Sequence, residues 1–410
     1  MRAGILTIGD ELINGFTVDT NAVWLSQALL SRGVSVAIKA SVGDETGAIE
    51  AILDQWDGEY DWVITTGGLG PTHDDITKSA FCNYFDSEIR FDEGYWQKLV
   101  ERFKGRGHTI PDNNRSQAEI PTKAEFIANP VGTAPGLKFI SKSTTFIVLP
   151  GVPREMKAIM TDHVLPDLEG QAPIAWLTLH TAGIFESALA MKLEPLLAKL
   201  GGIQLAYLPS YRGVDLRLRS LATGEQGRSK VASAAGEIEA FLGERVYGRD
   251  GDTLASVVGQ LLLARRETVA LAESCSGGVT ASDMTDVPGS SAYFKGGVVA
   301  YSDAAKVSQL GVNPATLETH GAVSEATARE LAEGARIAFD ATWGVATTGI
   351  AGPSGGSEEK PVGLVYLAVA GPDGTITREA RLVADRLPHK SATAHAALNL
   401  LRLELLGHGH

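Results

Sequence analysis

A short motif near residue 274 places possible nucleophiles next to two glycines. The segment AESCSGG (272–278) follows an apolar run that predicts a buried strand, and a helix is expected directly after it. Ser274, Cys275 and Ser276 would then lie on a sharp turn, which suits acyl transfer because amides around Ser276, Gly277 and Gly278 can hold an oxyanion. The motif does not match G-x-S-x-G, so an α/β-hydrolase is not implied.

A tyrosine and a lysine five residues apart supply a candidate base. Tyr301 ends a predicted strand, and Lys306 falls in the first turns of the next helix. A desolvated lysine can lose its proton near neutral pH and activate a serine, while a tyrosine hydroxyl can orient or relay that proton. The alternative is an interfacial tyrosine and a solvated lysine. Cys275 is a rival nucleophile, although buried cysteines are commonly inert and adjacent strand residues point to opposite faces.

A second glycine-rich segment, TTGIAGPSGGSEEKPVG (347–363), follows another predicted strand. Its exposed amides and hydroxyl suit a phosphate or ribose cradle, with Thr348, Gly349 and Gly352 as the substrate-binding residues. The GGSEEKP part is alternatively no more than a surface loop.

The N-terminal third carries a comparable turn, TTGGLGPTHDD (65–75). Its glycines permit close backbone approach to a ligand, and amides at a following helix N-terminus favour an anion. The expected phosphate-binding residues are Gly67, Gly68, Gly70 and Thr72. The carboxylates Asp74 and Asp75 are oxygen ligands for a hard divalent cation. A tight turn with aspartate caps is the alternative.

Two more segments are predicted to join this site. Asp10, in GDELI, follows the first predicted strand, and the carboxyl ends of parallel strands line a common crevice. Asp10 is therefore a third candidate metal ligand, with helix capping as the alternative. NPVGTAPG (129–136) is expected to add phosphate-binding groups, including Thr133, and LPGVPREM (149–156) one further carboxylate, Glu155.

The elements that would position these residues fall into three blocks. Residues 1–170 alternate strand and helix patterns, which indicates βαβ units. Residues 171–249 predict a small α+β unit with a β-hairpin that turns at Arg212 and Gly213. Residues 250–410 return to an alternating pattern. The predicted fold class is α/β, with two parallel or mixed-sheet α/β domains joined by a small α+β domain.

Composition excludes several classes of protein. The net charge is −13, from 36 basic and 49 acidic residues, which argues against a nucleic-acid partner. Two cysteines give no disulfide framework, and no apolar stretch is long enough for a membrane span. The N-terminus is too acidic and its apolar run too short for a signal peptide. A cytoplasmic protein without a membrane partner is expected.

These motifs together resemble the competence/damage-inducible protein CinA family along essentially the whole chain. GDELINGFTVDTN, TTGGLGPTHDD, NPVGTAPG and LPGVPREM are similar to its molybdopterin-binding-like N-terminal domain. AESCSGG, AYSDAAK, HGAVSE and TGIAGPSGGSEEKPVG are similar to its C-terminal nicotinamide mononucleotide deamidase domain. The middle block resembles the family's small KH-type domain.

The resemblance implies two hydrolase activities in pyridine nucleotide recycling. The N-terminal domain would be an ADP-ribose pyrophosphatase that depends on a divalent metal such as Mg, Mn or Co. The C-terminal domain would convert nicotinamide mononucleotide to nicotinate mononucleotide and ammonia without a cofactor. Carried over by position, its catalytic residues are Ser274, Tyr301 and Lys306, with Thr348 and Arg386 at the substrate.

The chain departs from the family pattern in two places. Ser276 stands where the family usually has threonine, which keeps the hydroxyl. Lys390 stands where a second arginine often follows Arg386, and a lysine grips phosphate less specifically. Other hypotheses remain: a deamidase whose N-terminal domain is silent or binds a pterin, or a competence-associated binding protein. The family also implies a homodimer.

Overall fold

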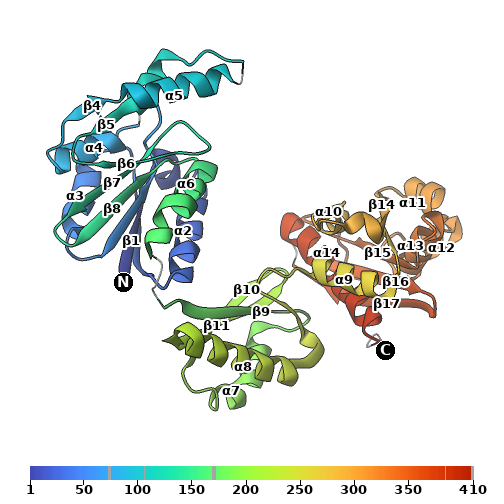
Figure 1. The fold of residues 1–410 in the computed structure, drawn as a ribbon. Helices are drawn as coiled ribbons and strands as arrows, with labels where there is room; N and C mark the ends of the chain where they lie inside the picture. Colours follow the sequence, from blue (N-terminus) through green and yellow to red (C-terminus); the bar gives the residue numbers. More distant parts are fainter. Residues whose placement is uncertain (73–74, 106, 169–171, 384, 408–410) are drawn as a thin grey trace. The chain divides into compact units, whose positions relative to one another are not determined.

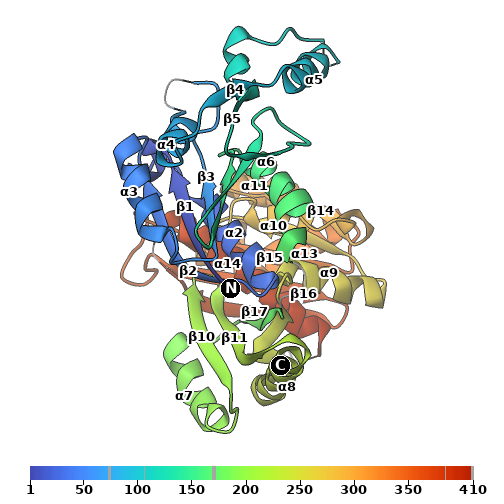
Figure 2. The ribbon, with the colours of Figure 1, turned by 60° about the vertical axis from the view of Figure 1, so that its left-hand side comes forward.

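The computed structural model describes residues 1–72, 75–105, 107–168, 172–383 and 385–407. The chain forms two compact units, shown in Figures 1 and 2. The first comprises Met1–Ala175 with Ala222–Gly227, and the second comprises Trp176–Leu221 with Arg228–His410. The predicted fold class is confirmed: mixed-sheet α/β domains flank a small α+β module.

The first unit is built on a mixed sheet. Its strands are β1 (Arg2–Ile8), β2 (Ser35–Val42), β3 (Trp62–Thr66), β6 (Glu125–Ile127), β7 (Gly136–Ser141) and β8 (Thr144–Leu149). They lie in the order β2-β1-β3-β8-β7-β6, in which β2, β1, β3 and β8 are parallel and β7 is antiparallel to both of its neighbours, β8 and β6. The apolar strand β3 is buried along its whole length, as expected for a central parallel strand.

Helices cover both faces of this sheet. They are α1 (Asp10–Ile13), α2 (Thr20–Ser31), α3 (Thr46–Trp56), α4 (Thr77–Tyr84), α5 (Glu93–Lys104) and α6 (Pro153–Ile159). Leu25 of α2 and Ile159 of α6 are buried in one cluster, whereas Leu53 of α3 and Phe81 of α4 are buried in the cluster on the opposite face. The short pair β4 (Ile89–Phe91) and β5 (Glu119–Pro121) lies with α5 at one end of the unit (Figure 1).

The α+β module has the strand order β10-β11-β9-β12. Its elements are β9 (Ile174–Thr181), α7 (Glu186–Leu197), β10 (Ile203–Ser210), β11 (Gly213–Thr223), α8 (Gly224–Leu242) and β12 (Val246–Arg249). The predicted hairpin is present, but its turn is one residue earlier than expected. Ser210 pairs with Gly213, so Tyr211 and Arg212 form the turn. Gly213 is needed inside the strand, because a Cβ there would lie 2.2 Å from the carbonyl oxygen of Thr181.

The C-terminal domain is built on a second mixed sheet. Its strands are β13 (Val269–Glu273), β14 (Phe294–Val299), β15 (Trp343–Gly349), β16 (Leu364–Gly371) and β17 (Gly374–Arg381). Their order is β14-β13-β15-β16-β17, in which β14, β13 and β15 are parallel and β16 is antiparallel to both of its neighbours, β15 and β17. The parallel strands β13 and β15 therefore end side by side at one edge of the sheet.

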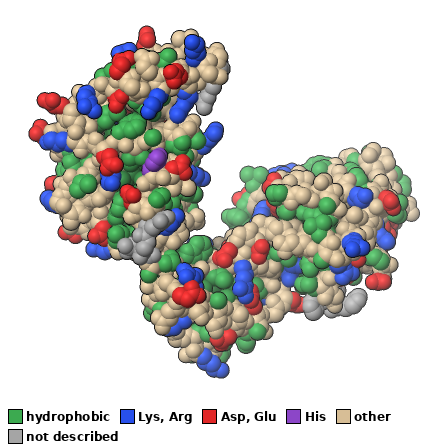
Figure 3. Space-filling view, in the orientation of Figure 1, with side chains coloured by type: hydrophobic (Ala, Val, Ile, Leu, Met, Phe, Trp, Pro, Cys, Tyr) green, Lys and Arg blue, Asp and Glu red, His purple; other side chains and the backbone are tan. Residues whose placement is uncertain are grey.

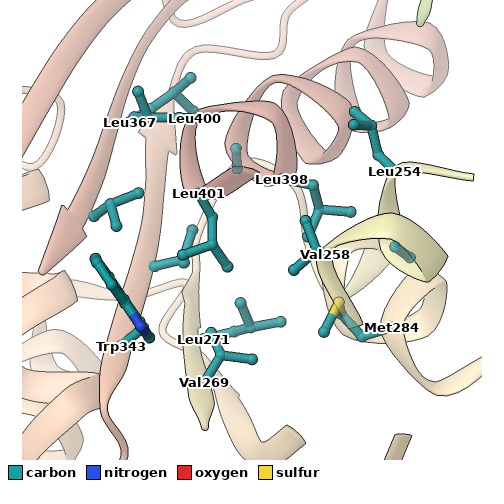
Figure 4. Close-up of a cluster of buried hydrophobic side chains, with 14 of the residues drawn as sticks. Leu254, Val258, Val269, Leu271, Met284, Trp343, Leu367, Leu398, Leu400 and Leu401 are labelled. Atoms are coloured by element: carbon teal, nitrogen blue, oxygen red, sulfur yellow. The ribbon is translucent and has the colours of Figure 1, made fainter. Parts of the chain in front are cut away.

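Two different layers of helices enclose this sheet. They are α9 (Leu254–Arg265), α10 (Val279–Thr285), α11 (Asp303–Leu310), α12 (Pro314–His320), α13 (Glu325–Ala338) and α14 (Arg386–Leu405). On one face, large side chains of α9 and α14 pack on Val269 and Leu271 (Figure 4). On the other face, Ala270 and Ala272 meet the alanines of α13. The small side chains allow α13 to approach closely, and a Cβ on Gly344 would lie 2.0 Å from a carbonyl oxygen of that helix.

The surface carries both signs of charge. On the face shown in Figure 3, basic and acidic side chains are interspersed rather than gathered in one basic band. Within the described ranges, no helix is long and apolar enough to cross a membrane.

The close packing of α9 predicts that Gly259 cannot accept a side chain. A Cβ at Gly259 would lie 2.4 Å from the hydroxyl of Tyr293, which is only 2% exposed. We expect Gly259→Ala to destabilise the domain by about 1–3 kcal/mol through overpacking, of which improved helix propensity offsets at most about 1 kcal/mol. Calorimetric unfolding of the full chain measures this change. Gly236→Ala in α8 is the control, because nothing lies within 4 Å of that Cβ; an equal shift for both variants would contradict the prediction.

Candidate functional site

The turn after β13 presents Ser274 at the wall of a cavity of about 260 Å³. The last residue of β13, Glu273, pairs with Thr347 of β15. The amide of Ser274 donates to the carbonyl oxygen of Thr347 at 3.0 Å and so extends this pairing by one step. Gly277 and Gly278 then adopt φ values of 58° and 91°, which turn the chain into α10.

Ser274 and Cys275 both contribute to the cavity wall, although strand alternation predicted opposite faces. The reason is that β13 has already ended, so the alternation no longer applies. Cys275 is also part of the hydrophobic core under α14, and burial raises the pKa of its thiol to about 12. Such a thiol is almost wholly protonated at neutral pH, which leaves Ser274 as the better candidate nucleophile.

The polar groups of Ser276 and Gly278 form hydrogen bonds that stabilise the turn itself. Ser276, Gly277 and Gly278 are not among the described residues that line the cavity. The Ser276 side chain is fully buried, and its hydroxyl shares a hydrogen bond of 2.7 Å with Thr347 Oγ1. The Gly278 amide, a predicted oxyanion donor, instead donates to the Glu273 carboxylate at 2.9 Å. An oxyanion would therefore have to use other amides of this turn.

Lys306 of α11 lines the same cavity and is only 1% exposed. Its ammonium group donates to the carbonyl oxygen of Tyr301 at 3.3 Å and lies 3.5 Å from Oδ1 of Asp303. Within the described structure, it forms no hydrogen bond with Ser274. The lysine side chain is thus buried, as predicted, and its nearest carboxylate is that of Asp303.

Arg386, at the start of α14, connects two other predicted residues at the cavity. Its guanidinium donates to the hydroxyl of Tyr301 at 2.7 Å and to the carbonyl oxygen of Gly352 at 3.1 Å. One turn further along α14, the side chain of Lys390 passes close to Gly277, where a Cβ would lie 3.2 Å from its Nζ. Lys306, Arg386 and Lys390 together make this edge of the sheet favourable for an anion.

Thr348 lines the cavity together with Gly349 and Gly352, in agreement with their predicted place. The Thr348 side chain is fully buried, however, and its hydroxyl donates to the carbonyl oxygen of Ala322 at 2.6 Å. This bond holds the loop before α13, so that Ala322 and Val323 form an apolar part of the cavity wall, together with Ile350. Sequence reasoning did not single out these apolar residues, because no chemical group marks them; their signal is their place in the HGAVSE and TGIAGPSGGSEEKPVG segments.

The N-terminal turns surround a larger cavity, of about 450 Å³. Gly67, Gly68 and Gly70 line it, as does Thr133, in agreement with their predicted place. Thr72 is not among the described lining residues, and its hydroxyl donates to Asp75.

The predicted metal ligands of this cavity are not assembled into a ready site. Asp75 lines the cavity, but its carboxylate accepts hydrogen bonds from the amides of Gly70 and Thr72. Asp10 exchanges hydrogen bonds with Asp44 and lies outside the lining. Asp74 lies outside the described residues. Among the residues that are described, no group of three His, Cys, Asp or Glu side chains could hold a metal ion.

The charge of this cavity is nevertheless distinctive. Carboxylates from several separate segments line it: Glu11, Asp19, Asp44, Asp75 and Glu155. Among the described lining residues, none is lysine, arginine or histidine. Oxygen donors of this kind fit a hard divalent cation, and an anionic substrate would need such a cation to offset the carboxylates. Glu155 lines the cavity, where a further carboxylate was expected, and it accepts a hydrogen bond from Asn129 at 2.6 Å, which links the LPGVPREM and NPVGTAPG segments.

Fold and sites together define a three-part α/β protein with a candidate site at the ends of the parallel strands of each α/β domain. Residues 4–170 match the family model described as a probable molybdopterin binding domain. Residues 177–248 match the damage-inducible protein CinA KH domain, and residues 251–405 match the CinA C-terminal domain.

Full-length relatives agree with these matches. The CinA-like protein of Salinibacter ruber is 42% identical over 99% of this chain and 100% of its own length. A putative competence-damage inducible protein of Halothermothrix orenii is 40% identical over 98% of each chain. A solved structure, the competence/damage inducible protein CihA from Agrobacterium tumefaciens, is 42% identical and covers 37% of this chain and 93% of its own, with a TM-score of 0.36. The chain belongs to the CinA family.

The burial of both cysteines predicts slow thiol chemistry. Burial raises the pKa of the thiols of Cys82 and Cys275. Because alkylation requires the thiolate and access to it, we expect both residues to react with iodoacetamide far more slowly in the folded protein at pH 8 than in denaturant. Mass spectrometry of peptides from timed reactions measures this. Rapid labelling of Cys275 in the folded chain would restore it as the rival nucleophile.

Proposed function

We propose that this protein is a nucleotide hydrolase with two separate sites, of which the C-terminal one deamidates nicotinamide mononucleotide. The observation that carries the proposal is a buried serine and a buried lysine on one small cavity, Ser274 and Lys306, with Arg386 at its edge. A serine hydroxyl is a weak nucleophile unless a base takes its proton, and a buried lysine is a suitable base. The family membership supports the same reaction class.

In the proposed reaction, Ser274 Oγ attacks the amide carbon and forms a tetrahedral intermediate. The serine proton passes to the lysine and then to the departing nitrogen, which leaves as ammonia. Water afterwards hydrolyses the acyl-serine and releases nicotinate mononucleotide. The negative oxygen of each intermediate needs hydrogen-bond donors. The Ser274 amide bonds Thr347, and Glu273 occupies later amides, so main-chain amides of residues 275–277 are the candidate donors.

The cavity offers different surroundings to the two ends of the substrate. Ala322, Val323 and Ile350 supply an apolar wall for the pyridine ring. Arg386 and Lys390 supply cations for the phosphate. A phosphate that binds Arg386 would compete with the Tyr301 hydroxyl for its guanidinium and so release that hydroxyl to assist proton transfer.

For the N-terminal domain, we propose a metal-dependent ADP-ribose pyrophosphatase. Asp75, with Asp10 and Asp74, would hold a divalent ion, which supplies charge neutralisation at the phosphates. Amides of the Gly67–Gly70 turn would orient the pyrophosphate beside Thr133. A second candidate is a pterin-binding domain without this activity, which the match to a probable molybdopterin binding domain favours.

Substitution of the serine and the lysine tests the deamidase. We expect Ser274→Ala and Lys306→Gln each to lower ammonia release from nicotinamide mononucleotide by roughly a thousandfold or more, and the double variant to lose little beyond that, because residues acting as a unit are not additive. Tyr301→Phe should cost less, roughly ten- to a thousandfold. Coupled ammonia assays on the full chain measure these rates.

Two further variants separate the possible roles. Lys306→Arg keeps the positive charge next to Asp303 but cannot lose its proton, so it should be as inactive as Lys306→Gln if the lysine is a base. An active Lys306→Arg would assign the lysine to charge stabilisation alone. Cys275→Ala should retain activity. If Cys275→Ala is inactive and Ser274→Ala is active, Ser274 is not the nucleophile. If every variant is active, the covalent mechanism is wrong.

Removal of metal tests the N-terminal proposal independently. ADP-ribose hydrolysis should stop in excess chelator and return with added Mg, Mn or Co, because the carboxylate-lined cavity cannot bind an anion without a cation. Ammonia release should persist in the same chelator. Asp75→Asn should abolish the hydrolysis, and chromatographic separation of the nucleotide products measures it. Hydrolysis that continues at full rate in chelator is incompatible with the proposal.

A further inference from the structure

A buried carboxylate adjoins the nucleophile turn and has no role in the reaction described above. Glu273 is 2% exposed and forms three hydrogen bonds with main-chain amides of the segment that follows the turn. Its Oε2 accepts from Gly278 at 2.9 Å and from Thr280 at 3.1 Å, and its Oε1 accepts from Ala281 at 2.7 Å. The chain therefore folds back on the side chain that precedes Ser274.

These amides are donors that a helix cannot satisfy by itself. The first amides of a helix lack partners within it, and a side chain at the N-cap usually supplies one. The N-cap residue of α10 is Gly278, which has no side chain to do this. Glu273 takes over the function from five residues earlier, so it joins the end of β13 to the first turn of α10.

A second side chain holds the other half of the turn. Thr347 of β15 accepts from the Ser274 amide through its carbonyl oxygen at 3.0 Å. Its Oγ1 lies 2.7 Å from Ser276 Oγ and 3.4 Å from the Ser274 amide nitrogen. Glu273 and Thr347 are both buried, and they are partners in the β13–β15 register. The backbone around Ser274 is thus held from its own strand and from the neighbouring strand.

We propose that Glu273 and Thr347 are positioning residues of the active site, which set the direction of Ser274 Oγ and of the free amides of its turn. This inference rests on the proposed deamidase for its kinetic consequence but not for its structural one. A carboxylate with two acceptor oxygens can serve all three amides, whereas a glutamine offers one carbonyl oxygen and turns an NH₂ group towards an N–H donor. The Glu273 carboxylate also occupies the N-terminal end of α10, where an anion would otherwise be stabilised. The oxyanion of the reaction would therefore rely on the amides of the turn, whose directions the turn geometry sets.

The test compares variants that differ by one polar group. Glu273→Gln should lower kcat for ammonia release by about tenfold to a hundredfold, with KM within about threefold, because a small misplacement of a nucleophile costs rate more than binding. Thr347→Val, which keeps the side-chain shape, should act in the same direction, and Thr347→Ser should restore activity. Hydrogen–deuterium exchange of the peptide covering 274–284 should become faster in Glu273→Gln, and this result does not depend on nicotinamide mononucleotide being the substrate.

Matched controls lie at the opposite ends of the same strands. Glu267 accepts a hydrogen bond from Trp343 Nε1 at 2.7 Å. The hydroxyl of Thr342 accepts from the Thr268 amide, and the hydroxyl of Thr268 accepts from the Thr342 amide, just before β15 and β13. Glu267→Gln and Thr342→Val should leave kcat and the exchange of 274–284 unchanged. If wild-type protein releases no ammonia, the proposed function fails, and faster exchange in Glu273→Gln still supports the structural role.

The two failures can be distinguished. Unchanged exchange in Glu273→Gln overturns the positioning role, as does an unchanged kcat in both Glu273→Gln and Thr347→Val when the wild type is active. If Glu273→Gln fails to fold, the comparison of Thr347→Val with Thr347→Ser decides the question. Where these two variants have equal thermal stability, a higher kcat in Thr347→Ser supports the positioning role, and an equal kcat in both overturns it.

Discussion

The C-terminal site depends on the pairing of two parallel strands that end side by side. The register that places Glu273 opposite Thr347 also places the Ser274 turn beside the glycine-rich segment after β15. Parallel strands must end at the same edge of a sheet, so Ser274 and Thr347, 73 positions apart in sequence, become hydrogen-bonded neighbours. α11 and α14 then only need to bring Lys306 and Arg386 to that edge.

The two cavities offer different solutions to the binding of an anion. The C-terminal cavity has cationic side chains, Lys306 and Arg386, and only one carboxylate, Asp303, among its described lining residues. The N-terminal cavity has several carboxylates and, among the described lining, no basic side chain. In the proposed reactions, cationic side chains would bind an anion directly in the first cavity, whereas a divalent cation would offset the carboxylates of the second.

Much of this architecture could be predicted from sequence. Buried apolar runs that end in glycines located β3, β13 and β15, and strand–helix alternation gave the α/β class. The same reasoning could not determine what a polar side chain at such a turn would bind. Asp75 looked like a metal ligand, but its carboxylate accepts the amides of Gly70 and Thr72, because a short acidic side chain competes well for nearby main-chain donors.

Residues that act through the backbone were the hardest to recognise. Glu273 lies inside the AESCSGG motif, but its importance arises from three amides that only come together when the turn folds. A charged residue inside an apolar strand is the one signal that sequence offers, since an unpaired buried carboxylate would be costly. Its position directly before a candidate nucleophile then indicates which amides it can reach. The same interpretation applies to Thr348, which lines the cavity but whose hydroxyl bonds the Ala322 carbonyl oxygen. In both cases the polar side chain fixes main chain, and the main chain forms the site.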